Sequence, residues 1–188
     1  MMQILTSTLT NMLAGTKGRL YRRDLGAAAS RFLQLLSHVK CLSISERVLR
    51  ILSCVKDLKN RLPTFHRLKQ LNVEREAGTD KALIALLQSA PSLESVVFNE
   101  FISMYTIYGL LNGDEDEGDN HANDDDGLDL DMVTIQLLHL KSVSFKVFSG
   151  RPREISWVKL ILKNAEVLET MTLFSLSSLF KCEKQRRI

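Results

Sequence analysis

The residues best suited to bind a metal ion or to act as nucleophiles are dispersed along the chain. Its four histidines lie far apart, and its three cysteines include no Cys-x-x-Cys pair. No GxxxxGK[ST], GxGxxG, GxSxG or HExxH motif is present. Phosphate-binding loops, a serine-hydrolase nucleophile and a zinc-peptidase site are therefore not indicated. The sequence predicts a protein that is not an enzyme and that holds no metal and no cofactor.

One segment is rich enough in carboxylates to be tested for calcium binding. Residues 112–131 contain ten acidic residues and no Lys or Arg. An EF-hand loop needs Asp at its first position and Gly at its sixth. With Gly118 or Gly127 at the sixth position, the first position is Gly113 or Ala122. Neither fits, so the composition predicts a solvated, disordered acidic insert.

The rest of the chain is basic. The 188 residues carry a formal charge of +3, but outside 112–131 there are 25 basic and 12 acidic residues, a formal +13. Such a body could attract nucleic acid. The basic residues are nevertheless spread over connecting segments, without the interleaved aromatic residues of nucleic-acid-binding motifs. A nucleic-acid- or chromatin-associated protein is the alternative function, and nucleic acid is not the favoured partner.

The sequence contains few signals that would direct the protein to a particular cellular compartment. No apolar run approaches the roughly 18–20 residues that a membrane span needs, so no membrane association is predicted. The first residues lack the basic and then apolar order of a secretory signal. An odd number of cysteines argues against a disulfide framework. We expect the nucleus or the cytoplasm.

A five-fold repeat is the main structural signal. The pattern has apolar residues at its first, fourth and sixth positions, and any residue at the positions between them. Successive copies start 29, 25, 47 and 28 residues apart, and the long interval falls to 27 when the acidic insert is subtracted. Such a period predicts stacked units of one short strand and one return connection. The copies begin at Val39, Leu68, Leu93, Leu140 and Leu168.

Alternation within each copy predicts a sheet with one buried face and one solvated face. All fifteen anchor positions are apolar, and twelve of the fifteen alternate positions are polar or charged. The three exceptions are Cys41, Val97 and Phe174.

The connections favour helices. Residues 24–37, 79–90 and 151–164 each place apolar residues on one helical stripe. The first stripe would hold Leu25, Ala28, Phe32, Leu35 and Leu36, and the last would hold Ile155, Val158, Ile161, Leu162 and Ala165.

A strand and a helix repeating at this period match the leucine-rich repeat, which stacks into an arc. Right-handed crossovers between parallel strands place all the helices on the same side. The predicted fold is therefore α/β: a leucine-rich-repeat-like solenoid arc with a parallel sheet on its concave face and helices on its convex face.

The last third of the chain carries a more specific pattern. It has a strand ending in Phe148-Ser149-Gly150, an acidic residue that opens a helix at Glu154, and Lys163-Asn164-Ala165 leading through Leu168-Glu169 to Met171. This segment closely resembles the FBD module at the C-terminus of many plant F-box/leucine-rich-repeat proteins. The segments from His38, Leu62 and Leu87 are similar to that family's repeat region, so the resemblance spans about residues 30–175.

One part of the family pattern is missing. Family members begin with an F-box, which docks the adaptor of a cullin-type ubiquitin ligase. Nothing in residues 1–30 resembles it. A short F-box-like sequence from Ile51 to Pro63 lies between two repeats. The resemblance thus implies the repeat and FBD portion without the ligase-docking end. Binding to the ligase adaptor is not expected.

These observations divide the chain into five predicted parts. They are a poorly defined N-terminal segment (1–23), leucine-rich-repeat-like units (24–111), the acidic disordered insert (112–131), an FBD-like C-terminal unit (132–180) and a basic tail (181–188).

The predicted function is protein recognition without catalysis, resembling the substrate-receptor region of an F-box ubiquitin-ligase adaptor. Besides the nucleic-acid alternative, a truncated family member with no retained activity stays open. We expect a monomer that binds an unknown protein target through the concave strand residues. The predicted contacts are Gln70, Asn72, Glu74, Ser95, Val97, Asn99, Ser144, Lys146, Thr172 and Phe174.

Overall fold

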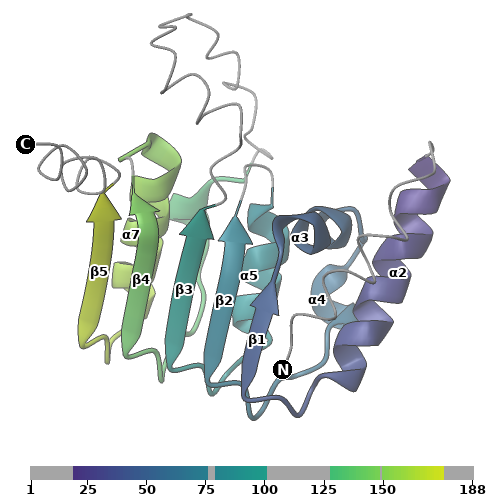
Figure 1. Ribbon diagram of the computed structural model, residues 1–188, viewed down its shortest axis with the longest axis horizontal. Helices are drawn as coiled ribbons and strands as arrows, with labels where there is room; N and C mark the ends of the chain where they lie inside the picture. The colour runs from purple at the N-terminus through teal and green to yellow at the C-terminus, as the bar shows by residue number, and fades with distance from the viewer. Residues whose placement is uncertain (1–18, 76–78, 101–127, 149, 176–188) are drawn as a thin grey trace, which may run out of the picture.

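A five-stranded parallel sheet organises the molecule (Figure 1). The computed structural model describes residues 19–75, 79–100, 128–148 and 150–175. The strands lie side by side in sequence order, and each neighbouring pair is parallel. The predicted parallel sheet is therefore confirmed. Its strands are β1 (Cys41–Ile44), β2 (Gln70–Arg75), β3 (Ser95–Glu100), β4 (Ser142–Phe148) and β5 (Thr170–Ser175).

The helices connect these strands on one side of the sheet. Figure 1 shows α5 and α7 behind the strands, with α2, α3 and α4 grouped at the β1 end. This follows from the right-handed crossover that joins parallel strands. The helices are α2 (Arg19–Leu35), α3 (Glu46–Ser53), α4 (Leu58–Arg61), α5 (Asp80–Gln88) and α7 (Pro152–Asn164), with a 3₁₀ turn η2 (Leu130–Met132).

The inward strand positions of the first four repeats form the core, whereas those of the fifth are only partly buried or exposed. Leu42, Leu71, Val96 and Val143 are paired across the four strands from β1 to β4, and each is at most 2% exposed. The next inward position along the strands is equally buried at Ile44, Val73, Phe98 and Phe145. The rings of Phe98 and Phe145 stack with centroids 4.5 Å apart, and that of Trp157 lies 5.9 Å from Phe98.

The first helix buries a different stripe from the predicted one. Ala29 and Leu33 are buried, whereas Leu35, placed on the stripe by the sequence pattern, is 71% exposed. The cause is close helix packing through small residues. A methyl group added at Gly26 would collide with Val55, which follows α3. A stripe of large apolar residues would hold α2 farther away.

Two predicted boundaries shift. Residues 19–23, assigned to a poorly defined segment, belong to α2. Residues 128–131, assigned to the disordered insert, belong to the folded body, because η2 buries Leu130 to 2% exposure. This end of the segment differs from the acidic stretch before it, because it contains the apolar residues Leu128 and Leu130. The remainder of the predicted insert, the first eighteen residues and the basic tail lie outside the described residues.

The helices were compared with the length and apolar character that a membrane span requires. In the described part of the chain, none is both long enough and apolar enough to cross a bilayer.

The two faces of β2 should respond very differently to mutation. Leu71 is fully buried and Asn72 is its half-buried neighbour on the other face. We expect Leu71→Ala to lower the free energy of unfolding by about 2–5 kcal/mol, because a cavity remains. Asn72→Ala removes surface hydrogen bonds and should cost about 1 kcal/mol or less. Urea unfolding measures both, and equal losses would contradict the assignment of the faces.

Candidate protein-interaction surface

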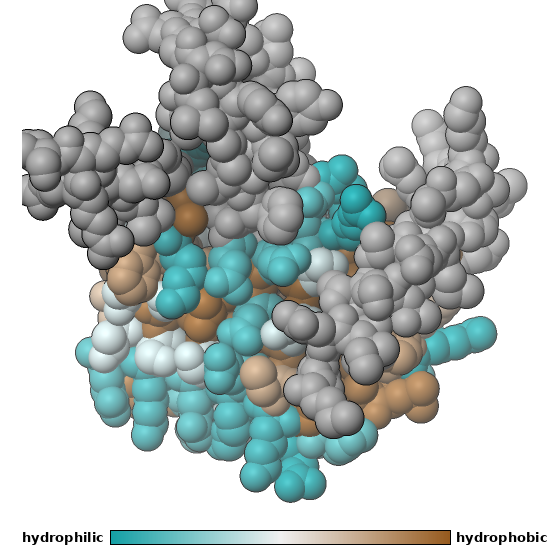
Figure 2. Space-filling view, in the orientation of Figure 1, coloured by the Kyte–Doolittle hydropathy of each residue, from teal (hydrophilic) through white to brown (hydrophobic). Residues whose placement is uncertain are grey.

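The solvated side of the sheet is the candidate site, and the register of the strands brings its side chains together. Asn72 is paired with Val97, Val97 with Ser144, and Ser144 with Thr172. We call this side the open face. Besides the ten predicted contacts it includes Cys41, Ser43, Ser142 and Thr170. Figure 2 views this side and shows predominantly hydrophilic side chains along the lower edge, where the strands begin.

Hydrogen bonds order the β1–β2 part of the open face. The Asn72 amide donates to Ser43 Oγ over 3.1 Å, and its Oδ1 accepts from the amide of Gln70 at 3.0 Å. Farther along, Ser142 Oγ donates to Ser95 Oγ over 2.9 Å. These groups are uncharged donors and acceptors held in rows, an arrangement suited to hydrogen-bonding a partner surface.

Two apolar side chains interrupt this polar surface. Val97 lies in its centre, half-buried, and Phe174 lies on β5 with 44% exposure. The ammonium nitrogen of Lys146 sits 5.1 Å from the centroid of the Phe174 ring, within cation–π range. Exposed aromatic groups that are fixed by a neighbour are typical anchors of protein interfaces.

A charged ladder borders the open face where the strands begin. Lys40, Lys69, Glu94 and Lys141 are consecutive along it, because each backbone N–H from Lys69 onward donates to the preceding carbonyl. Lys69 Nζ donates to Glu94 Oε1 over 2.6 Å. This hydrogen bond, with the nearby charges of Lys69, Lys141 and His139, holds the pKa of Glu94 below its ordinary value.

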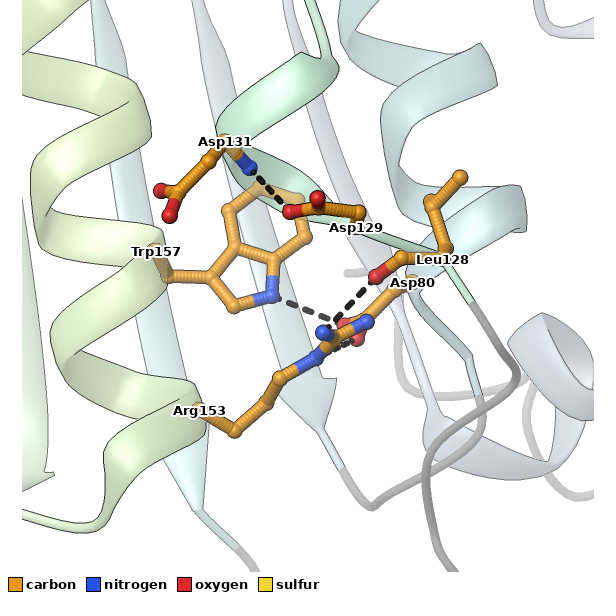
Figure 3. Close-up of polar contacts among 6 residues, drawn as sticks. All are labelled: Asp80, Leu128, Asp129, Asp131, Arg153 and Trp157. Atoms are coloured by element: carbon orange, nitrogen blue, oxygen red, sulfur yellow. Dashed lines mark hydrogen bonds and ion pairs between the residues drawn. The ribbon is translucent and has the colours of Figure 1, made fainter.

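A buried carboxylate joins α5, which follows β2, to α7, which follows β4 (Figure 3). Asp80, the first residue of α5, is 2% exposed. Its Oδ1 accepts a hydrogen bond from Trp157 Nε1 at 2.8 Å, and its Oδ2 accepts one from Arg153 Nε. Arg153 also donates to the carbonyl of Leu128 over 2.9 Å. Burial of a carboxylate is tolerated here because both of its oxygens are satisfied.

The residues that carry the sequence resemblance support the ends of α7. Gly150 has φ +77°, a left-handed conformation that favours glycine. The Glu154 carboxylate accepts from the backbone N–H groups of Gly150 at 2.7 Å and Arg151 at 3.1 Å. At the other end, Asn164 Oδ1 accepts from the N–H of Ile135 at 3.2 Å. These roles are structural, and Gly150, Glu154 and Asn164 all lie outside the open face.

Comparison with known proteins agrees with this geometry. Residues 136–173 match the family model described as FBD. The chain carries an FBD domain. The domain contains β4, α7 and most of β5, so three of its residues on the open face are Ser144, Lys146 and Thr172.

The chain is also similar to longer plant proteins. It is 35% identical over 78 residues to a putative F-box/LRR-repeat protein of Arabidopsis thaliana, covering 41% of this chain and 14% of that protein. It is 33% identical over 79 residues to an F-box/LRR-repeat protein of the same plant, covering 42% and 20%. The predicted relationship to the F-box/FBD family is confirmed, although these matches do not test the leucine-rich repeats. No solved structure matches the chain at a significant level.

The structure places all ten predicted contact residues in strands β2 to β5, on the face that the alternation predicts. Whether they bind a partner stays a prediction. The Asp80–Trp157 hydrogen bond could not be predicted from the sequence pattern, because its partners are 77 residues apart. Among the described residues, no three His, Cys, Asp or Glu side chains are grouped to hold a metal ion. The absence of metals and cofactors likewise stays a prediction.

The Asp80 contacts should be necessary for packing the FBD domain against α5. We expect Asp80→Ala to lower the free energy of unfolding by about 3 kcal/mol, because buried donors lose their acceptor. Trp157 is the only tryptophan, so a red shift of its emission would report water reaching the indole. Asp129→Ala is the matched control, since Asp129 is exposed and accepts only a local backbone bond. Equal effects of the two substitutions would contradict this role.

The lowered pKa of Glu94 should depend on Lys69. Because the folded protein holds the carboxylate form more strongly, the stabilisation is present at neutral pH and is lost as the pH falls through the pKa of Glu94. Lys69→Met should raise that pKa towards its ordinary value, as measured by NMR titration of the carboxyl carbon. Lys40→Met, on the far side of Lys69, is the control. A shift of the same size in both variants would argue against the pairing.

Proposed function

We propose that this chain is a non-enzymatic protein-recognition module of the F-box/FBD family, resembling the substrate-receptor region of a ubiquitin-ligase adaptor. In this proposal the repeated strand–helix units form a leucine-rich-repeat-like arc. The open face is its concave side, and a protein target lies against it. The single observation that supports the proposal most strongly is the alignment of the polar positions of five parallel strands on the face that none of the described helices covers.

The composition of the open face suits a protein partner. Its side chains are mostly hydroxyls and amides, with Val97 and Phe174 as apolar anchors. Protein interfaces combine such anchors with surrounding hydrogen-bonding groups, and the anchors contribute most of the affinity. Hydroxyl and amide side chains can also be desolvated at lower cost than charges.

The same composition does not favour nucleic acid. Lys146 is the one basic side chain among the fourteen open-face residues named above, and it already lies over the Phe174 ring. Binding to a phosphate backbone requires several unpaired basic side chains in one region. The formal excess of basic residues therefore does not translate into a basic open face.

The resemblance extends the proposal to the ligase. The curated relatives are F-box/LRR-repeat proteins, and the matched part spans a seventh to a fifth of their length. We propose that this chain supplies target recognition and does not itself recruit the ligase adaptor, since residues 1–30 do not resemble an F-box. It would act in the nucleus or the cytoplasm.

An acidic residue in the centre of the open face should abolish target binding. We expect Val97→Glu to lower target recovery at least about ten-fold, because it replaces an apolar anchor by a charge that must be desolvated. The measurement is quantitative mass spectrometry of plant-extract proteins retained by the immobilised chain. Lys56→Glu, an exposed site after α3, is the control for charge. Urea unfolding verifies that both variants are folded.

A target is then a protein that is lost with Val97→Glu and kept with Lys56→Glu. Absence of any such protein would count against the open face as the binding site. Direct stoichiometric binding of the ligase adaptor would contradict the expectation for this chain. Retention of nucleic acid with a steep salt dependence would favour the alternative function.

A further inference from the structure

The last strand leaves uncovered a position that the other four strands bury. Ile44, Val73, Phe98 and Phe145 occupy the second inward position of β1 to β4, and each is at most 4% exposed. Leu173 is paired with Phe145 and occupies the same position in β5, yet it is 45% exposed. The side of β5 that should pack into the core is therefore open among the described residues.

The neighbouring helix continues this apolar surface. Arg153 and Leu160 lie on the flank of α7 that faces the preceding unit, where Arg153 reaches Asp80 and α7 contacts η2. Ile155 and Leu162 each follow one of these residues by two positions, which is about 200° around a helix. They therefore point towards the β5 end, and they are 42% and 58% exposed.

Among the described residues, the outer edge of β5 also faces no further strand. Within the described residues β5 pairs only with β4, so between Thr170 and Phe174 the backbone N–H and C=O groups that point away from β4 face no further strand. Its sequence, Thr-Met-Thr-Leu-Phe-Ser, contains no charge, Pro or Gly. Natural edge strands usually carry charged residues, Pro or a bulge to prevent pairing with other chains. The β4–β5 pair has a register shift between Phe145 and Phe148, beyond the level of Leu173, but β5 itself has no charge and no Pro. An uncharged, apolar edge is suited to pairing with another strand.

We propose that β5 pairs with β5 of a second copy of this chain, in antiparallel orientation about a two-fold axis perpendicular to the sheet. The strand carries no charge that such an axis would place against itself. One continuous ten-stranded sheet results, with the helices of both copies on the same side. The interface uses the same surface on both copies, so association closes at the dimer.

The spacing of the elements fits this arrangement. A crossover helix lies over the two strands that it joins, so α7 lies about half a strand spacing inside β5. Adding the β5–β5 spacing and the same offset in the second copy gives two strand spacings between the two α7 axes. At about 4.8 Å per strand this is about 9.6 Å, which matches the 8–10 Å of packed helices.

The two α7 helices would then pack through the flanks that are now exposed. Ile155 and Leu162 of each copy meet over the pair of Leu173 side chains. A single event thus satisfies the strand edge and covers all three apolar residues. The sequence analysis predicts a monomer, since the repeat pattern alone does not show that Leu173 is exposed.

Sedimentation velocity of the full 188-residue chain over a concentration series tests the proposal. The expected result is a shift from the 21.3 kDa monomer to twice that mass as concentration rises. Leu173→Lys and Leu162→Lys should each raise the dissociation constant at least about ten-fold, because a charge enters an apolar interface. Leu35→Lys, at a more exposed leucine on α2, should leave it unchanged.

Hydrogen–deuterium exchange locates the contact. The amides of residues 170–175 should exchange more slowly at high concentration, and those of β1 should not change. A chain that stays monomeric throughout would overturn the proposal. So would a dimer that is weakened equally by Leu35→Lys, or one that leaves the exchange of β5 unchanged. Leu162 lies on a helix surface, so its variant retains the test if Leu173→Lys does not fold.

Discussion

Parallel pairing of five consecutive strands is the constraint from which the other features follow. Each return connection must cross on the same side, so the described helices all cover one face of the sheet and none of them covers the other. Alternation within each strand then fixes the role of every residue. Leu71 and Val73 must be apolar because they face the helices, whereas Asn72, between them, can be chosen for binding. Core and candidate site are therefore the two sides of the same short strands.

Stacked units need further contacts, because apolar packing alone does not fix how one helix lies against the next. Asp80 supplies such a contact across 73 and 77 residues of sequence to Arg153 and Trp157. A buried carboxylate is strongly directional, since an unsatisfied oxygen would carry a large desolvation cost. It therefore favours one relative position of α5 and α7. The FBD domain is in this sense part of the same sheet and core as the preceding strands and not a separate unit.

Much of the fold could be predicted from the sequence because its main signal, the alternation of apolar anchors such as Leu42 and Phe145, is local. The same alternation predicted on which face of the sheet each candidate contact residue lies. Features that depend on distant residues could not be predicted. The small residues Gly26 and Ala29 let α2 approach closely, which rotated its buried stripe away from Leu35. Ile155 and Leu162 fit an apolar stripe, but the stripe does not say whether another element covers it.

The family match and the candidate site place different demands on the same segment. Gly150, Glu154 and Asn164 are part of the FBD pattern because they hold the ends of α7. Ser144, Lys146 and Thr172 lie in the same segment but face solvent, where substitutions usually change stability little. Selection for folding therefore restricts the first group and leaves the second available for a target. It follows that recognition of the family identifies the scaffold, whereas the proposed target specificity would depend on the open-face residues of this chain.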